Sequence, residues 1–224
     1  MRLLEYIEKD VSSARQLITS YCKPFIREMG RHIVDVSPGA NYNFLWRGHE
    51  AFITNIIVMK TRNDRNPKDT PVEISKIIDD LMEEKFGWRP RSSGVFAVPN
   101  INTANEYGRP YIFFPIGQYK YIWSPQIDDM YELIAEISDF SIKDNELERD
   151  WKELGKNKSM SFEEYKERAH SKVIEKIRKY IKTYKNTGLK DAGMYNEITF
   201  NCNRYVLIDP EMQEEVIEIV KSLV

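Results

Sequence analysis

The sequence predicts an α+β fold for a single domain over residues 1–224. Two observations carry this prediction. Segments with apolar residues at three- and four-residue steps, typical of helices, are interspersed with short apolar or alternating runs, typical of strands. The two kinds of segment follow each other without the strict strand–helix alternation of a parallel sheet, which favours α+β over a doubly wound architecture.

Composition supports a folded chain and narrows the function classes. Hydrophobic residues make up 42% and aromatic residues 12%, which is globular rather than disordered. The formal net charge of −2 gives no global basic field for coating nucleic acid. The two cysteines, Cys22 and Cys202, are far apart, so we expect no disulfide framework, a cytoplasmic setting and no metal site. No apolar run approaches a membrane span.

The N-terminal part predicts a helical extension over residues 1–30. Its apolar stripe runs from Leu4 through Ile7 and Ile18 to Tyr21. After Gly30 the pattern changes, and we expect extended pieces around a turn at residues 37–39. The apolar run 44–46 then predicts a buried strand that ends on Arg47 and Gly48.

The middle of the chain predicts a helix followed by strands. Thr70 as N-cap, Pro71 at the first position and Glu73 in a capping box predict a helix that Gly87 terminates. Strands are expected within residues 93–123, with one short helical turn near residue 102. Another helix is expected after Ser124.

The C-terminal part predicts two helices and a strand. Residues 140–160 lack periodicity and are expected to be a connector. Ser161 and Glu164 form a capping box that begins the longest helix. The segment 197–208 alternates as a half-buried strand or hairpin, and Asp209 caps a C-terminal helix over residues 209–224.

Four segments could carry chemistry, and each also has a purely structural interpretation. Arg47 could bind phosphate or ribose, with Gly48 allowing close approach of a ligand, or it could pair with a carboxylate. The loop 60–71 contains Arg62 and Arg65 and precedes a helix N-terminus, which attracts anions, although charge runs are usually solvated.

The other two segments are 92–108 and 195–200. Phe96 and Tyr107 could be core aromatics or walls of a binding site. Glu197 at the start of a strand is ordinarily a solvated residue, but it follows a glycine-containing loop.

Taken in order, these segments resemble the ADP-ribosyltransferase superfamily. "LWRG" is similar to the family's arginine motif, which places Arg47 at the arginine position. "GVFAVPNINTANEYG" is similar to the middle motif and the helix after it, with Phe96, Ala104 and Tyr107 at the matching positions. "YNEITF" is similar to the third motif, which places Glu197 at the catalytic glutamate.

The resemblance covers residues 42–208, the expected core, and departs from the family in two places. A clean Ser-Thr-Ser motif is replaced by Ser92-Ser93. Tyr195 stands two residues before the glutamate, where arginine-modifying members carry Glu, so the acceptor is open.

The resemblance implies a split antiparallel β-core flanked by helices and a mono-ADP-ribosyltransferase, toxin- or effector-like, that uses NAD as substrate. It implies that Glu197 stabilises an oxocarbenium-like transition state, as in glycoside hydrolysis, while nicotinamide is released. Arg47, Arg62 and Arg65 would hold the dinucleotide, and Phe96 and Tyr107 would enclose the nicotinamide. Tyr195 would contribute to recognition of a macromolecular acceptor, either protein or nucleic acid.

Two alternatives remain. One is a non-catalytic module on the same fold that binds a nucleotide or a partner. The other is a nucleic-acid-binding surface that combines cations with stacking aromatics. Its residues would be Arg89, Arg91, Tyr119, Lys120, Tyr121 and Trp123. The enzyme hypothesis requires Arg47, Phe96, Tyr107 and Glu197 to converge on one cleft.

Overall fold

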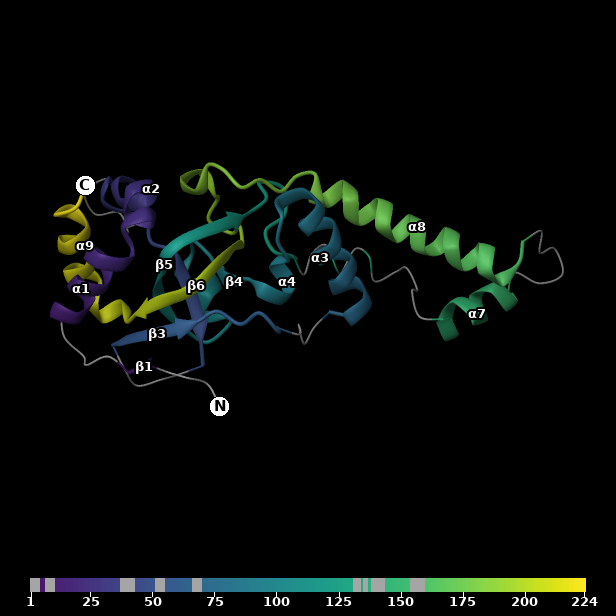
Figure 1. Cartoon of the computed structure of the whole chain (residues 1–224), viewed down its shortest axis with the longest axis horizontal. Coiled ribbons are helices and arrows are strands. Elements are labelled where there is room, and N and C mark those ends of the chain that lie inside the picture. The colour runs from purple at the N-terminus through teal and green to yellow at the C-terminus, as the bar shows by residue number, and fades with distance from the viewer. Residues whose placement is uncertain are drawn as a thin grey trace.

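A curved antiparallel sheet forms the centre of the protein. The structure is a computed structural model that describes residues 5–6, 11–36, 43–50, 55–65, 70–130, 134, 137, 144–153 and 160–224. Its two longest strands, β5 (Arg109–Ile122) and β6 (Ile198–Ile208), pair with each other over most of their length. The mixed α+β class is therefore confirmed (Figure 1).

The edge of β6 opposite β5 is shared by two strands, and the candidate site lies next to the shorter of them. β3 (Ile56–Lys60) pairs with the C-terminal half of β6, and β4 (Val95–Ala97) pairs with its first residues. β2 (Trp46–His49) pairs with β5, and Trp46 also exchanges backbone hydrogen bonds with Val98 just after β4. The start of β2 therefore lies against the end of β4, although a strand order of β1-β3-β6-β5-β2 separates β2 from β6.

The N-terminal helices belong to the main core. The described helices here are α1 (Val11–Tyr21) and α2 (Lys23–Val34), which pack with α9 (Gln213–Lys221) at one end of the sheet (Figure 1). Ile18, Phe25 and Val216 share one hydrophobic cluster with the strands.

The two helices between residues 11 and 34 complete this cluster. Two N-terminal expectations are corrected. A helix from Leu4 onward is wrong, because Glu5–Tyr6 form β1, which pairs with β3. The chain is helical through Val34 instead of extended after Gly30, and the expected turn at 37–39 lies outside the described residues.

A second cluster lies beyond the strand ends, between α3 (Val72–Phe86) and the C-terminal half of α8 (Phe162–Ile181). Ile78, Met82 and Ile177 are buried in it. Gly87 ends α3 with a positive φ of 74°, as the sequence predicts. The start of α3 differs from the prediction, because the cap position is Pro71 and no side chain caps the helix. Most of the helix expected after Ser124 lies outside the described residues.

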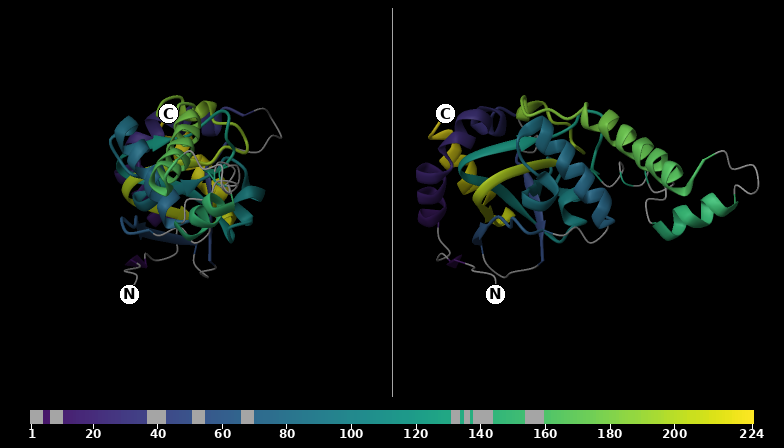
Figure 2. Two further views of the ribbon diagram at one scale, coloured as in Figure 1. Left: turned by 90° about the vertical axis from the view of Figure 1, so that its right-hand side faces the viewer. Right: turned by 45° about the vertical axis from the view of Figure 1, so that its right-hand side comes forward.

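The long helix α8 extends away from the sheet (Figure 2). Its predicted capping box is confirmed, since Ser161 and Glu164 bond reciprocally. Beside its outer end lies α7 (Asp144–Glu153), so the expected irregular connector at 140–160 is wrong over those residues. The ring centres of Trp151 in α7 and Phe162 in α8 lie 5.7 Å apart. This contact gives α7 an apolar partner that cannot be seen in the polar sequence of α7 alone.

The remaining described elements are short or terminal. α4 (Pro90–Ser93) and α5 (Ile101–Asn105) flank β4, and the side chain of Asn100 caps α5. A 3-10 turn at Pro210–Met212 precedes α9, and Asp209 caps it by accepting from the Glu211 N–H. Another 3-10 turn is formed by Leu189–Asp191. Among the described residues, no helix has the length and apolarity that a membrane crossing needs.

Lys85 is expected to stabilise the attachment of α8. Its Nζ donates to the carbonyl oxygens of Ile181, Lys182 and Tyr184 at 2.8, 3.1 and 2.7 Å, where α8 ends. A cation at a helix C-terminus satisfies carbonyls that lack intrahelical partners. Lys85→Met should lower the free energy of unfolding by about 0.5–1.5 kcal/mol in urea denaturation. Lys172→Met, on an exposed part of α8, is the matched control, and equal losses in both variants would contradict this role.

Candidate functional site

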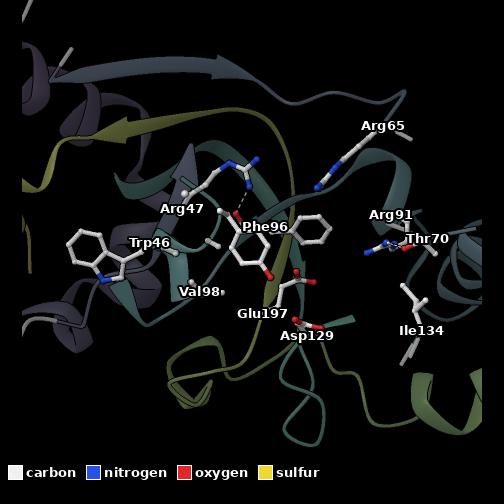
Figure 3. A pocket seen from close by; sticks show the side chains of 14 residues that line it. Trp46, Arg47, Arg65, Thr70, Arg91, Phe96, Val98, Asp129, Ile134 and Glu197 are labelled. Carbon is white, nitrogen blue, oxygen red and sulfur yellow. Dashed lines mark hydrogen bonds between the residues drawn. The ribbon is translucent and has the colours of Figure 1, made fainter. Parts of the chain in front are cut away.

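A cavity of about 550 Å³ opens where β2, β4 and the start of β6 meet. It is lined by Arg47 and Gly48 of β2, Phe96 of β4, Tyr107 after α5, and Glu197 just before β6 (Figure 3). These residues come from four separate parts of the sequence. The four residues that the enzyme hypothesis requires in one cleft therefore line one cavity, whose size lies within the usual range for small-molecule sites.

Arg47 is held in place where β2 lies against the end of β4. Its Nη1 donates to the carbonyl oxygen of Phe96 at 2.6 Å, and its guanidinium carbon lies 5.7 Å from the ring centre of Tyr205. Its Nε is buried without a hydrogen-bond partner among the described residues. No ion pair joins Arg47 to a carboxylate of those residues, so the part of the chain that the structure describes does not support the interpretation of an ion-paired arginine.

Two further arginines extend this cationic lining. Arg65 stacks on Phe96, with its guanidinium carbon 4.2 Å from the ring centre, and its backbone N–H donates to Ser92 O at 3.0 Å. Arg91 is 8% exposed and donates from Nη2 to the hydroxyl of Thr70 at 2.7 Å. Arg65 Nη1 and Arg91 Nε are buried without partners among the described residues, and neither arginine is ion-paired there.

Glu197 lies among these arginines, with its exposed part facing the cavity (Figure 3). Its backbone N–H donates to Asp128 O at 2.5 Å, which ties the residue to the neighbouring segment. Burial, with a smaller contribution from the nearby Asp129, raises the pKa of its carboxyl to about 7 against the opposing effect of Arg91, Arg65 and Arg47. A carboxyl in a cleft with a strongly raised pKa is typical of functional sites.

Arg65 stays charged at neutral pH. Burial and then the neighbouring Arg47 lower its pKa, to about 10. Among the described residues, three arginines and two carboxylates, Asp129 and Glu197, line the cavity. Buried donors without acceptors are unfavourable, so a lining of this kind is suited to an anionic ligand.

Gly48 lines the cavity and also has a packing role. A Cβ at this position would collide with the carbonyl oxygen of Ala104 and would lie 2.8 Å from Tyr107 Cβ. Glycine therefore allows the close approach of α5 and of the residue that follows it.

Gly48→Ala is therefore expected to displace α5 and Tyr107. We expect a loss of about 1–3 kcal/mol in the free energy of unfolding, the scale of an overpacked buried site. Thermal and urea denaturation would measure it. A variant as stable as the wild type would show that α5 yields without cost and would contradict this packing role.

Two other predicted site residues lie outside the cavity lining. Arg62 is exposed and pairs with Asp64 at 3.1 Å, so its assignment to the dinucleotide site is not supported. Tyr195 is 59% exposed, two residues before Glu197, and does not line the cavity. Its exposure is compatible with contact to a large acceptor.

The sequence prediction missed Arg91, Thr70 and Asp129. Arg91 had been grouped with a surface for nucleic acid, and Thr70 with a helix cap, yet the Thr70 hydroxyl bonds Arg91 instead. One signal was present in the sequence. Asp79 lies on the buried side of α3, and a buried acid implies a polar partner, here the backbone of Arg91.

The alternative nucleic-acid surface does not form. Trp123 is 1% exposed and donates from Nε1 to Thr187 O at 3.0 Å. Tyr119 and Tyr121 both donate their hydroxyls to Glu28, at 2.5 and 2.7 Å. With Arg91 in the cavity and Arg89 paired with acids of α3, the six residues do not form one continuous exposed face, although Tyr119, Lys120 and Tyr121 line one pocket.

No group of three or more His, Cys, Asp or Glu among the described residues is placed to hold a metal ion. Comparisons of the chain with protein-family models, with curated proteins and with solved structures found no match. Its function therefore has to be inferred from the cavity itself.

Proposed function

We propose that this protein is an NAD-dependent mono-ADP-ribosyltransferase with an ADP-ribosyltransferase-like fold. It transfers ADP-ribose to a macromolecular acceptor, protein or nucleic acid, and releases nicotinamide. The observation that carries the proposal is the convergence of Arg47, Phe96, Tyr107 and Glu197 on one cavity. A cationic lining, an aromatic wall and a carboxylate are the three features that this reaction needs.

The binding part of the proposal rests on Arg47 and Arg65. Both guanidinium groups flank Phe96, one through the carbonyl bond and the other through ring stacking. Each retains a buried N–H without an acceptor among the described residues. Guanidinium groups match phosphate oxygens in geometry, so a diphosphate is a fitting ligand for this pair.

The chemical part of the proposal rests on Glu197. When the bond between nicotinamide and ribose breaks, its electron pair leaves with nicotinamide and positive charge develops on the ribose. A carboxylate fixed beside that ribose stabilises the charge as it appears. The acceptor nucleophile then bonds to the ribose carbon, and its proton passes to Glu197 or to solvent. Phe96 and Tyr107 would exclude water from the reacting bond.

The direct test uses NAD labelled in its adenine part. The protein is incubated with labelled NAD and a lysate, and protein and nucleic acid are then separated, while free nicotinamide is measured. Label in one macromolecular fraction together with nicotinamide release supports the proposal. If NAD binds without release or transfer, the non-catalytic binding module becomes the better interpretation. Absence of NAD binding would reject both.

Arg65 and Arg62 form a matched pair for testing the binding site. Both are arginines of one loop, but only Arg65 lines the cavity. Arg65→Ala should weaken NAD binding by about 1–3 kcal/mol, the scale of hydrogen bonds to charged groups, while Arg62→Ala should change it little. Calorimetric titration of both variants decides the matter, and equal losses would place the dinucleotide elsewhere.

A further inference from the structure

The corner of the cavity at Arg91 and Thr70 is set apart from the Arg47 side. Phe96 lies between them, with Arg47 on one side of the cavity and Arg91 on the other (Figure 3). Of the three arginines, Arg91 exerts the largest electrostatic effect on Glu197 and Arg47 the smallest. Arg65, in contrast, is influenced more by Arg47 than by Arg91. Arg91 thus lies apart from Arg47, across Phe96, and is the arginine that acts most strongly on Glu197.

The Arg91 corner is held rigidly before any ligand arrives. The carboxylate of Asp79 accepts the backbone N–H groups of Arg91 and Ser92 at 2.7 and 3.0 Å, and Asp79 is 4% exposed. The Ser92 carbonyl in turn accepts the N–H of Arg65. One buried acid on α3 therefore fixes the backbone that carries Arg91 and orients the loop that carries Arg65.

The donors in this corner are not all used by the described residues. Among those residues, Arg91 is more than nine-tenths buried, makes one side-chain hydrogen bond, to Thr70, and has an Nε without a partner. The Thr70 hydroxyl accepts that bond, and a hydroxyl that accepts can also donate its own proton. A fixed guanidinium beside a hydroxyl donor is a fitting arrangement for a tetrahedral oxyanion.

The number of cations also exceeds what the proposed substrate requires. The diphosphate of NAD carries two negative charges, which the pair Arg47 and Arg65 can match. A third guanidinium, on the other side of Phe96 from Arg47, is not needed to match these two charges. It lies where a second substrate must approach the reacting ribose carbon if Glu197 acts there.

We propose that Arg91 and Thr70 form a second oxyanion subsite, which binds a phosphate-type group carried by the second substrate. The cavity then holds two anionic groups at once, one on each side of Phe96. The assignment to the second substrate rests on the proposed transferase function, whereas the presence of an oxyanion site at Arg91 does not.

The test is calorimetric titration with inorganic phosphate at constant ionic strength. The free protein is expected to bind two phosphates, and protein saturated with ADP-ribose is expected to bind one. Arg91→Met should weaken the phosphate site that remains beside ADP-ribose by about tenfold or more. Thr70→Val should weaken it less, since it removes one neutral donor. Arg89→Met is the matched control, because Arg89 lies two residues away and is exposed and paired with Asp80 and Glu83.

Three results would overturn the proposal. They are a single phosphate site in the free protein, loss of all phosphate binding on saturation with ADP-ribose, and unchanged phosphate binding in Arg91→Met. If Arg91→Met does not fold cooperatively, Arg91→Lys and Thr70→Val replace it, and normal binding by both rejects the subsite. If ADP-ribose fails to bind, the transferase proposal fails separately. The oxyanion subsite is then judged on the free protein, where Arg91→Met should abolish one of two phosphates and Arg47→Lys should weaken the other.

Discussion

Replacing Glu197 by Gln is expected to slow nicotinamide release by about 10²-fold or more, while NAD affinity changes little. The substitution keeps the size and most of the hydrogen-bonding capacity of the side chain and removes its charge. The charge matters only when the ribose becomes cationic, so the effect belongs to turnover and not to ground-state binding.

The measurement compares nicotinamide release and NAD affinity for wild type and Glu197→Gln. Glu106→Gln serves as the control, because Glu106 is exposed just after α5 and does not line the cavity. It should release nicotinamide at the wild-type rate. If Glu197→Gln also keeps the wild-type rate, the transferase assignment is rejected and the non-catalytic binding module takes its place.

The pH dependence of kcat/KM gives a second view of the same residue. The pKa of Glu197 is about 7 in the free protein, and the stabilising form is the carboxylate. kcat/KM for nicotinamide release should therefore rise with pH and level off above about 7, since this parameter reports ionisations of the free enzyme. The rise should be absent from the residual activity of Glu197→Gln.

The order of motifs in the sequence led to the principal cavity residues, because each lies on an element whose position is locally encoded. Arg47 follows an apolar run whose last residue, Trp46, begins β2, so the strand starts later than the run predicts and Arg47 is its second residue. Glu197 directly precedes an alternating segment that forms β6. Asn100 caps α5 and so fixes where Tyr107 follows. These local sequence patterns predict the structure well because the same residues form the paired strands and the helix cap of the folded protein.

The loop arginines could not be told apart from sequence. Arg62 and Arg65 lie three residues apart in a polar segment without periodicity. What separates them is the bond from Arg65 N–H to Ser92 O and the stacking on Phe96, both contacts between distant parts of the chain. Among the described residues, Arg62 bonds the nearby Asp64 and remains exposed.

Arg91 and α7 were misjudged for a related reason. Arg91 stands beside Pro90 and Arg89, which suggested a surface cluster, but Asp79 of α3 draws its backbone inward. The α7 segment has few apolar residues, and only Leu147 and Trp151, four residues apart, mark its apolar side. The partner α8 completes its apolar side through Phe162. In both cases the deciding partner lies on another element.

Glu197 should also lower the free energy of unfolding, over a pH range set by the pKa values of its carboxyl in the unfolded and folded states. Burial raises its pKa from 4.5 to about 7, so the folded protein binds this proton more tightly than the unfolded chain. Below about pH 4.5 the carboxyl is protonated in both states and causes no penalty. As the pH rises toward about 7, the unfolded chain loses the proton first, and stability falls. Above about 7 the penalty is complete.

Glu197→Gln should therefore be more stable than the wild type by about 1–3 kcal/mol at pH 8, with the difference vanishing near pH 4.5. This stability change has the opposite sign to the one expected for most buried acids with ion-pair partners, because the effect of burial on the pKa outweighs the attraction of the three arginines. Urea denaturation at a series of pH values would measure the difference, with Glu167→Gln on the exposed face of α8 as a control expected to show no such trend. A Gln variant that is less stable than wild type at pH 8 would mean that the arginines hold Glu197 as a structural ion pair. The same carboxylate would then be unsuited to act on a substrate, since its charge would already be committed within the protein.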